Sequence, residues 1–151
     1  MEEIRKHDGV LSIMHVCRGN WTTDESVLLQ GAYDKLGKFF DALDLDMLAL
    51  EFSTPRAGEV EKLFSNNFLD TRVMLGFGCV NPRSEVIETP EEIVARVEEV
   101  LQFLPPERIW LNPDCGFATF AKRPLNPYPI IQKKLENMVA ASKILREKYC
   151  K

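Results

Sequence analysis

The chain has 151 residues, of which 45% are hydrophobic and 28% are charged, and its net charge is −4. This composition is typical of a soluble globular protein and argues against a disordered or fibrous chain. No basic stripe interleaves with aromatic residues, so we expect no nucleic-acid partner. The apolar runs are too short to span a bilayer. The charged start Met1–Lys6 lacks the apolar core of a secretory signal. We expect one cytoplasmic domain over residues 1–151, without a membrane partner, because no linker divides the sequence.

Four cysteines are spread along the chain without forming a Cys-x-x-Cys pair: Cys17, Cys79, Cys115 and Cys150. A cytoplasmic protein keeps its thiols reduced, so disulfides are not expected. Metal binding or catalysis therefore competes with buried free thiols as the explanation. Composition alone favours buried thiols, whereas the neighbours of Cys17 and Cys115 favour chemistry.

Strands and helices are predicted to alternate from the first strand onward. The first strand is expected over residues 10–16, followed by a helix over 25–43. A second strand over 46–52 precedes a short helix over 58–64, and a third strand covers 72–77. The inward residues of the helix over 25–43 recur at helical spacing: Leu28, Ala32, Leu36, Phe39, Phe40 and Leu43.

The next helix has the clearest start signal in the chain. Thr89 is a natural N-cap, Pro90 occupies the first helical position, and Glu92 completes a capping box. Two prolines at 105–106 end this helix, and the fourth strand covers 108–111. A last helix is expected to point these residues inward: Ile131, Leu135, Met138, Val139, Ser142 and Leu145.

This alternation predicts an α/β fold with a parallel sheet covered by helices. In such sheets ligands and catalytic residues gather at the carboxyl ends of the strands. His15 and Cys17 end the first strand on one face, Glu51 ends the second, and Cys115 follows the fourth. One imidazole, two thiolates and one carboxylate suit tetrahedral zinc. The alternative is a buried histidine, two buried thiols and a carboxylate at the sheet edge.

Three segments resemble the catalytic C-terminal domain of cobalamin-independent methionine synthase: His15–Asn20, Leu50-Glu51 and Glu107–Phe117. The wider family includes methionine-synthase-like proteins and epoxyalkane:coenzyme M transferases. The similarity extends from about Leu11 to Lys148, and its most specific part is Asn-Pro-Asp-Cys-Gly. The resemblance implies that zinc is held by His15, Cys17, Glu51 and Cys115.

The resemblance also implies a (β/α)₈ barrel with zinc at its C-terminal face. A whole barrel needs about 250 residues, and four consecutive βα units correspond to its C-terminal half. We therefore expect the chain either to associate with a chain carrying the N-terminal half-barrel or to self-associate.

The activity implied is that of a 5-methyltetrahydropteroyltriglutamate–homocysteine S-methyltransferase, in which zinc activates a thiol such as homocysteine for methylation in methionine synthesis. Thiolates are the reactive form of thiols, and zinc coordination removes the thiol proton. Glu51 is the expected exchangeable ligand, because an incoming thiolate displaces a hard oxygen donor more easily than a cysteine. Two alternatives stay open: alkyl transfer to another thiol, as with coenzyme M and an epoxide, or a half-barrel that binds zinc or docks without turnover.

The chain departs from the folate enzymes after the third strand, where they have an Asp-x-His-Ser stretch. Here Asn81 replaces the aspartate and Arg83 the histidine. Arginine cannot deliver a proton near neutral pH, because its pKa is above about 12. We expect Glu51 and Arg83 to be the catalytic residues, with Arg83 pairing with an anionic group such as a carboxylate, sulfonate or phosphate. The alternative is that Arg83 lies in a surface loop. Arg18 and Asn20 are expected either to orient the metal ligands or to cap the following helix.

Overall fold

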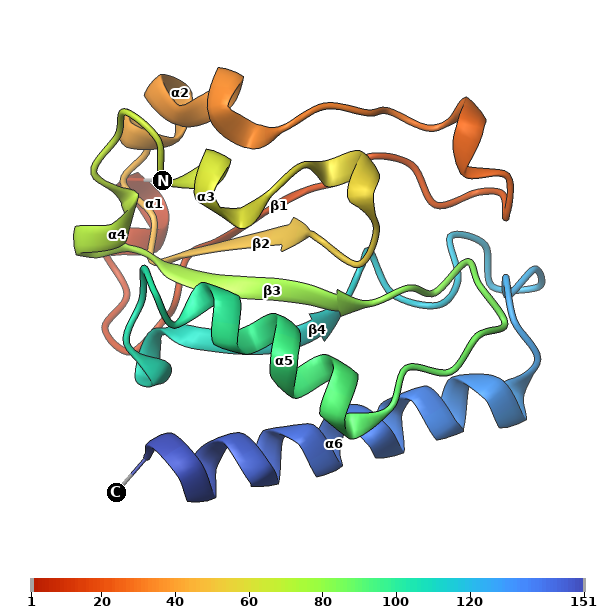
Figure 1. The fold of residues 1–151 in the computed structure, drawn as a ribbon. Helices are drawn as coiled ribbons and strands as arrows, with labels where there is room; N and C mark the ends of the chain where they lie inside the picture. The colour runs from red at the N-terminus through yellow and green to blue at the C-terminus, as the bar shows by residue number, and fades with distance from the viewer. Residues whose placement is uncertain (1, 151) are drawn as a thin grey trace.

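Residues 2–150 are described by a computed structural model, in which four parallel strands form one sheet in the order β1-β2-β3-β4 (Figure 1). The strands are β1 (Ile13–Val16), β2 (Met47–Glu51), β3 (Met74–Val80) and β4 (Ile109–Pro113). Parallel neighbours that follow each other in the chain need a crossover behind the sheet each time. The predicted α/β fold of four consecutive βα units is confirmed, although β1 is shorter than expected and β3 and β4 run further.

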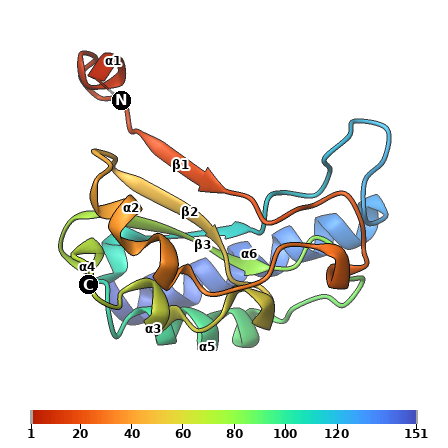
Figure 2. The same cartoon turned by 90° about the horizontal axis from the view of Figure 1, so that it is seen from above.

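The crossovers and termini contain short helices and two long ones. Figure 2 shows α2, α3 and α5 on one side of the sheet, with α1 standing apart near the start of β1. The α-helices are α1 (Glu2–Arg5), α2 (Gly37–Asp41), α3 (Val60–Leu63), α4 (Leu69–Arg72), α5 (Pro90–Val100) and α6 (Tyr128–Tyr149). The 3₁₀ turns are η1 (Glu25–Val27), η2 (Tyr33–Leu36), η3 (Pro55–Ala57) and η4 (Pro106–Arg108).

The two faces of the sheet differ sharply in burial. The face covered by helices carries the core side chains Leu48, Leu50, Leu75 and Phe77, none more than 1% exposed. On the opposite face Ile13 is 53% exposed and Trp110 is 49% exposed, in a shallow hollow of about 360 Å³. These two sides of the sheet are the covered face and the open face.

The helix expected over residues 25–43 is wrong as a continuous element. The chain forms η1, then extended backbone, then η2 and α2. Gly31 adopts φ +128°, which a helix does not allow. The backbone N–H groups of Leu29 and Gly31 instead donate to the carbonyls of Arg18 (3.0 Å) and Arg56 (2.9 Å). Long-range hydrogen bonds therefore replaced the local helix that apolar spacing predicted.

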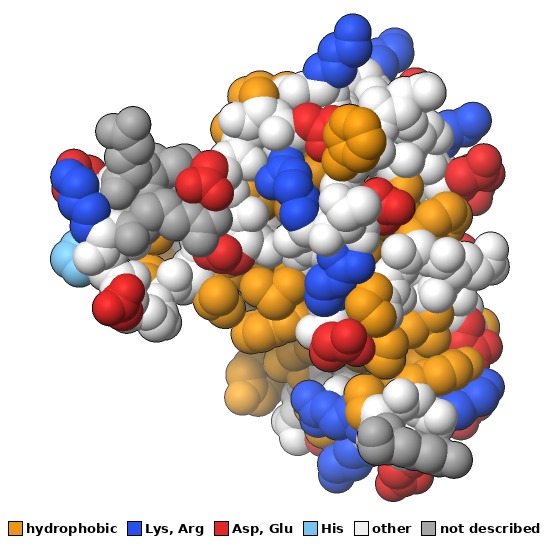
Figure 3. Space-filling view, turned by 90° about the vertical axis from the view of Figure 1, so that its left-hand side faces the viewer, with side chains coloured by type: hydrophobic (Ala, Val, Ile, Leu, Met, Phe, Trp, Pro, Cys, Tyr) orange, Lys and Arg blue, Asp and Glu red, His pale blue; other side chains and the backbone are white. Residues whose placement is uncertain are grey.

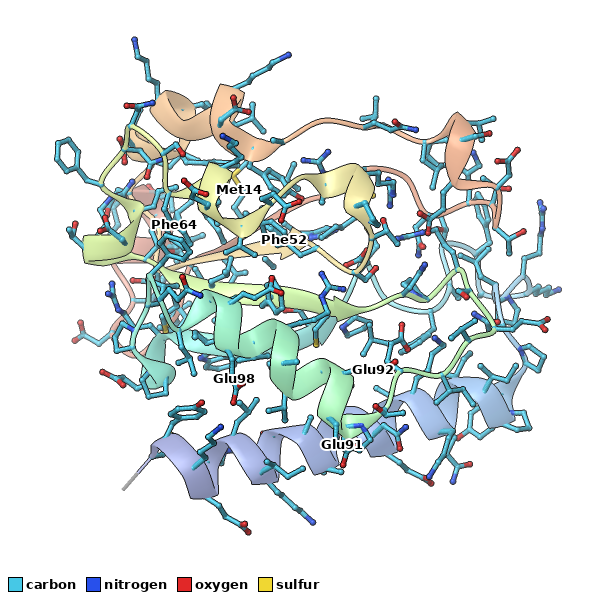
Figure 4. The ribbon with its side chains drawn as sticks, in the orientation of Figure 1. Met14, Phe52, Phe64, Glu91, Glu92 and Glu98 are labelled. Atoms are coloured by element: carbon cyan, nitrogen blue, oxygen red, sulfur yellow. The ribbon has the colours of Figure 1, made fainter. Side chains whose placement is uncertain are left out.

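The helix α5 begins as predicted, with Thr89 and Glu92 forming the capping box. Glu98 extends from α5 towards α6 (Figure 4) and accepts hydrogen bonds from Lys148 Nζ and Tyr149 Oη, both at 2.7 Å.

The helix α6 departs from its predicted inward face. Met138 and Leu145 pack against the core, whereas Leu135 and Val139 were expected inward and are 39% and 53% exposed. Val139 lines an apolar groove of about 520 Å³ between α6, α5 and β4, which leaves it exposed.

Figure 3 shows the end of the molecule where the strands begin, with hydrophobic side chains gathered beside the projecting N-terminal segment. This gathering agrees with the exposure of Val10, Leu11 and Ile13. Within the described residues, no helix combines the length and apolarity needed to cross a bilayer.

Candidate metal centre

His15 ends β1 on the open face, with its ring directed across the sheet. Its Nδ1 lies 2.8 Å from the Ala49 carbonyl oxygen, and a carbonyl only accepts, so Nδ1 carries the proton. Nε2 is then the lone-pair nitrogen, and it lies 2.9 Å from Cys115 Sγ. A histidine fixed through one nitrogen to a backbone carbonyl is the arrangement that metal-binding histidines adopt.

Glu51 ends β2 and is 1% exposed. Its Oε1 accepts a hydrogen bond from the Arg18 backbone N–H (2.8 Å) and lies 2.8 Å from Cys115 Sγ. Its Oε2 accepts from Arg56 Nη2 at 2.7 Å. Tyr33 fixes the backbone of the same residue, since the Glu51 N–H donates to the Tyr33 hydroxyl at 3.0 Å. The buried carboxylate is thus held from both ends.

Cys115 follows β4 in an unusual backbone conformation. Its φ is +47°, and Gly116 continues with φ +84°. A non-glycine residue with positive φ costs about 1 kcal/mol or more and is concentrated at functional sites. The turn brings Cys115 Sγ to 3.0 Å from Cys17 Sγ, and both cysteines are free. Burial, with hydrogen bonds to Cys17 and Glu51, raises the pKa of the Cys115 thiol.

One ligand atom from each of His15, Cys17, Glu51 and Cys115 lies within 4.8 Å of the other three. The sequence placed these residues at the carboxyl ends of three strands, and the structure brings them together. The donor set fits zinc, which takes nitrogen, thiolate sulfur and carboxylate oxygen in a tetrahedral arrangement. Softer copper(I) and harder magnesium fit this mixed set less well.

Arg83 lies in the turn after β3 and is 2% exposed, so the alternative of a surface loop is wrong. Its anionic partners are the chain's own carboxylates. Nη2 donates to Asp114 Oδ2 at 2.8 Å and Nε donates to Glu25 Oε1 at 3.0 Å, while Nη1 lies 3.8 Å from Glu51 Oε2. Burial opposes the charge of Arg83, yet its hydrogen bonds to Glu25 and Asp114 raise its pKa. Its expected catalytic role stays a prediction.

Sequence reasoning gave no role to two residues of this site. Asp114 directly precedes Cys115, and its Oδ1 accepts from the backbone N–H groups of Phe52 (3.1 Å) and Ser53 (3.2 Å). A Cβ at Gly78 would lie 2.3 Å from that oxygen, so only glycine permits this contact. Burial raises the pKa of Asp114, although hydrogen bonds from Ser53 and Arg83 act in the opposite direction.

The second is Arg56, five residues beyond Glu51 in η3. Asp114 binds groups far away in the sequence, and Arg56, although close to Glu51 in the sequence, is held by the distant carbonyls of Arg18 and Leu29. Spacing alone therefore gave no signal for either residue.

Arg18 and Asn20 act on the site instead of capping a helix. The Arg18 N–H binds Glu51, and Asn20 Nδ2 donates to the Gly116 carbonyl at 2.9 Å. The cap of η1 is Asp24, whose side chain accepts from the Ser26 N–H. Cys79 lies apart from the site, on the covered face, where burial raises the pKa of its thiol to about 12.

Known proteins are similar in sequence to this chain. The family model for the catalytic domain of cobalamin-independent synthase matches residues 14–144. The chain belongs to the cobalamin-independent methionine synthase family. It is 33% identical to a methionine synthase of Sulfurisphaera tokodaii over 97% of this chain and 37% of that protein. It is 30% identical to one of Thermococcus kodakarensis over 88% of this chain and 33% of that protein.

The fold of this family is shared as well. A solved B12-independent methionine synthase from Shewanella sp. W3-18-1, in complex with selenomethionine, is 19% identical with a TM-score of 0.71. The match covers 93% of this chain and 40% of that chain. The chain spans about a third of the length of the curated relatives it matches first. The predicted family is confirmed, and the chain corresponds to only part of the length of the family members that it matches.

Proposed function

We propose that this chain is the zinc-binding part of a methionine-synthase-type enzyme that activates a small thiol, such as homocysteine, for S-methylation. The observation that carries the proposal is the meeting of four metal-competent atoms within 4.8 Å at the carboxyl ends of parallel strands. His15, Cys17, Glu51 and Cys115 would hold the metal. Zinc, when bound, supplies a Lewis acid that keeps a thiol as its nucleophilic thiolate near neutral pH.

The residues around the site have separate tasks in this proposal. The Ala49 carbonyl selects the His15 tautomer that leaves Nε2 available as a donor. The Arg18 N–H and the Arg56 guanidinium orient the Glu51 carboxylate. Arg83 binds Asp114, which braces the loop that carries Cys115. Arg83 is therefore a positioning residue here and does not move a proton.

The exposed open face indicates that the reaction requires a further structural element opposite the sheet. A wall opposite the sheet would be needed to shape a pocket for the thiol and its methyl donor, and Ile13 and Trp110 remain exposed where that wall would pack. We propose that four further strands, from an N-terminal half-barrel or a second copy, close the barrel. Residues 1–151 would then act as one domain of the closed enzyme.

Alkyl transfer to a different thiol uses the same site, and one observation favours keeping it as the second candidate. Arg83 stands where the folate enzymes have a histidine, and it is fully engaged with carboxylates. Proton delivery to a folate nitrogen by that position is thereby excluded. A donor whose leaving group takes its proton from elsewhere fits this feature. With an epoxide as donor and coenzyme M as acceptor, attack by the thiolate would form the C–S bond, break a C–O bond of the ring and leave an alkoxide that takes its proton from water.

Calorimetric titration of the zinc-loaded chain with homocysteine and with coenzyme M, in buffers of different ionisation enthalpy, tests the proposal. Thiol binding with release of about one proton per thiol is expected, because coordination deprotonates the thiol. Homoserine, which has a hydroxyl in place of the thiol, serves as the control and should not bind. Absence of thiol binding to chain that holds zinc would contradict thiol activation.

A further inference from the structure

The two oxygens of Glu51 face different partners. Oε1 lies among the prospective metal ligands, 2.8 Å from Cys115 Sγ. Oε2 faces the other way and accepts from Arg56 Nη2 at 2.7 Å, with side chains only 1% and 6% exposed. A buried carboxylate without a charged partner is costly, so its pairing decides where it can lie.

Arg56 is held in place independently of Glu51. Its Nη1 donates to the carbonyls of Leu29 (3.1 Å) and Arg18 (3.3 Å), both in the loop after β1. The Arg56 carbonyl in turn accepts from the Gly31 N–H at 2.9 Å. These contacts use the extended segment that replaced the predicted helix. The guanidinium is thus a fixed positive charge against which Glu51 can move.

Arg83 is a weaker partner for Glu51. Its closest nitrogen lies 3.8 Å from Oε2, and its direct hydrogen bonds go to Glu25 and Asp114. Within the described residues, only the Arg56 side chain donates a hydrogen bond to Glu51 Oε2. The two arginines therefore have different tasks: Arg83 braces the Cys115 loop, and Arg56 pairs with the exchangeable carboxylate.

We propose that Arg56 is a positioning residue that makes Glu51 a ligand able to leave the metal, by pairing with the carboxylate when an incoming thiol takes its place. The inference rests on the proposed function and adds a role for a residue outside the ligand set. Two thiolates and a carboxylate already outweigh a divalent ion, and an arriving thiolate adds further negative charge. The guanidinium offsets that charge at Oε2. The displaced Glu51 carboxylate is then not left buried without a charged partner.

Removing Arg56 should separate metal binding from thiol binding. In Arg56→Gln the four ligands and the Arg18 N–H on Oε1 remain, so zinc affinity is expected to fall less than thiol affinity. Thiol affinity is expected to fall about 10- to 100-fold, the usual loss for a buried charge-assisted hydrogen bond. Arg56→Lys keeps the charge without the forked donors, so its thiol affinity should lie between those of wild type and Arg56→Gln.

Arg72 is the matched control. It too donates to two backbone carbonyls, those of Leu43 (2.9 Å) and Phe40 (2.7 Å), and lies 3.8 Å from a carboxylate oxygen of Asp41. It belongs to α4, at the opposite end of the sheet from the site (Figure 1). Arg72→Gln should leave both affinities at the wild-type values.

The experiment uses the full chain in two measurements. Zinc affinity is measured by competition with a chromogenic chelator. Thiol affinity is measured from the sulfur-to-cobalt absorption bands of Co²⁺-loaded protein during titration with homocysteine and, separately, coenzyme M. A loss of thiol affinity that exceeds the loss of zinc affinity in Arg56→Gln supports the inference.

Equal thiol affinity in wild type and Arg56→Gln overturns the inference and leaves the proposed function standing. A loss of zinc affinity as large as the loss of thiol affinity also overturns it, since Arg56 would then only orient a metal ligand. A wild-type chain that holds cobalt without any spectral response to either thiol overturns the proposed function and this inference together. Should Arg56→Gln not fold, Arg56→Lys decides, and thiol affinity equal to wild type would overturn the inference.

Discussion

The covered and open faces of the sheet show how one set of strands serves two purposes. On the covered face, Leu50, Leu75 and Phe77 are buried under helices. On the open face the strands carry Ile13 and Trp110 in solvent, while their carboxyl ends carry the four prospective metal ligands. Because side chains alternate along a strand, each strand contributes to both faces. Stability is therefore expected to depend on the covered face and metal binding on the ends of the open face.

The largest effect should come from breaking the covered face. Phe77 is fully buried and stacks on Phe52 with ring centroids 5.4 Å apart. Phe77→Ala should lower the free energy of unfolding by about 3–5 kcal/mol. Trp110→Ala, on the open face, should cost about 1 kcal/mol or less. Urea unfolding of both variants measures the difference, and equal costs would show that the open face also contributes core stability.

At the strand ends, Cys115→Ser should remove most of the bound zinc, because a neutral hydroxyl is a far poorer ligand than a thiolate. Cys79→Ser serves as its control, since Cys79 lies on the covered face, and should leave the metal content unchanged. Elemental analysis after dialysis gives both values. Similar metal contents in the two variants would refute the separate roles assigned to these cysteines.

A smaller effect is expected from the residue that braces the Cys115 loop. Asp114→Asn keeps the size of the side chain and removes the charge paired with Arg83. Zinc affinity should fall about 10- to 100-fold, as for other residues that orient metal ligands. Asp70→Asn, an exposed carboxylate on α4, is the control. Chelator competition measures both, and undiminished affinity in Asp114→Asn would exclude a bracing role.

The smallest effect concerns the reactivity of the thiols, which should differ between the covered face and the exposed parts of the chain. Burial raises the pKa of Cys79 from 9.0 to about 12, so its thiol keeps the proton well above neutral pH. Iodoacetamide at pH 8 should label the exposed Cys17 and Cys150 in metal-free native protein and leave Cys79 unlabelled. Mass spectrometry of the labelled peptides reports each site. Labelling of Cys79 at the rate of Cys150 would show that the covered face opens readily.

The same pKa shift predicts how stability depends on pH. The thiol of Cys79 ionises near its ordinary pKa of 9.0 in the unfolded chain and near 12 in the folded chain. Its contribution to stability is therefore complete below about pH 9 and is lost as the pH rises from there towards about 12. Cys79→Ala should flatten this alkaline decline in urea midpoints, and an identical decline would assign it to other groups.

Much of the fold followed from local signals. The capping box at Thr89 and Glu92 located the start of α5, and the alternation of apolar strands with helices predicted the parallel sheet. The helix over 25–43 failed because Gly31 and the carbonyls of Arg18 and Arg56 determine that segment, and such long-range partners leave no periodic trace. The exposed side of α6, with Leu135 and Val139, was misjudged because an amphipathic pattern does not say which surface is present to cover it.

The candidate metal centre was likewise predictable only in part. The His-x-Cys pair at the end of β1, Glu51 and Cys115 were predictable from residue types at strand ends. The ion pairs of Arg56 with Glu51 and of Arg83 with Asp114 were not. Arg83 and Asp114 come together only in the finished sheet, and Arg56 is directed at nearby Glu51 by carbonyls of the distant loop after β1. Sequence reasoning thus found the prospective ligands and missed the charges that hold them.

Zinc X-ray absorption on the purified, zinc-supplemented chain, combined with elemental analysis, tests the central claim most directly. The account predicts about one zinc per chain, bound by two sulfur and two nitrogen or oxygen neighbours at the distances usual for tetrahedral sites. On addition of homocysteine, one nitrogen or oxygen neighbour should be replaced by sulfur, with Glu51 leaving towards Arg56. Well under half an equivalent of zinc, or a shell without sulfur, would contradict the metal centre itself.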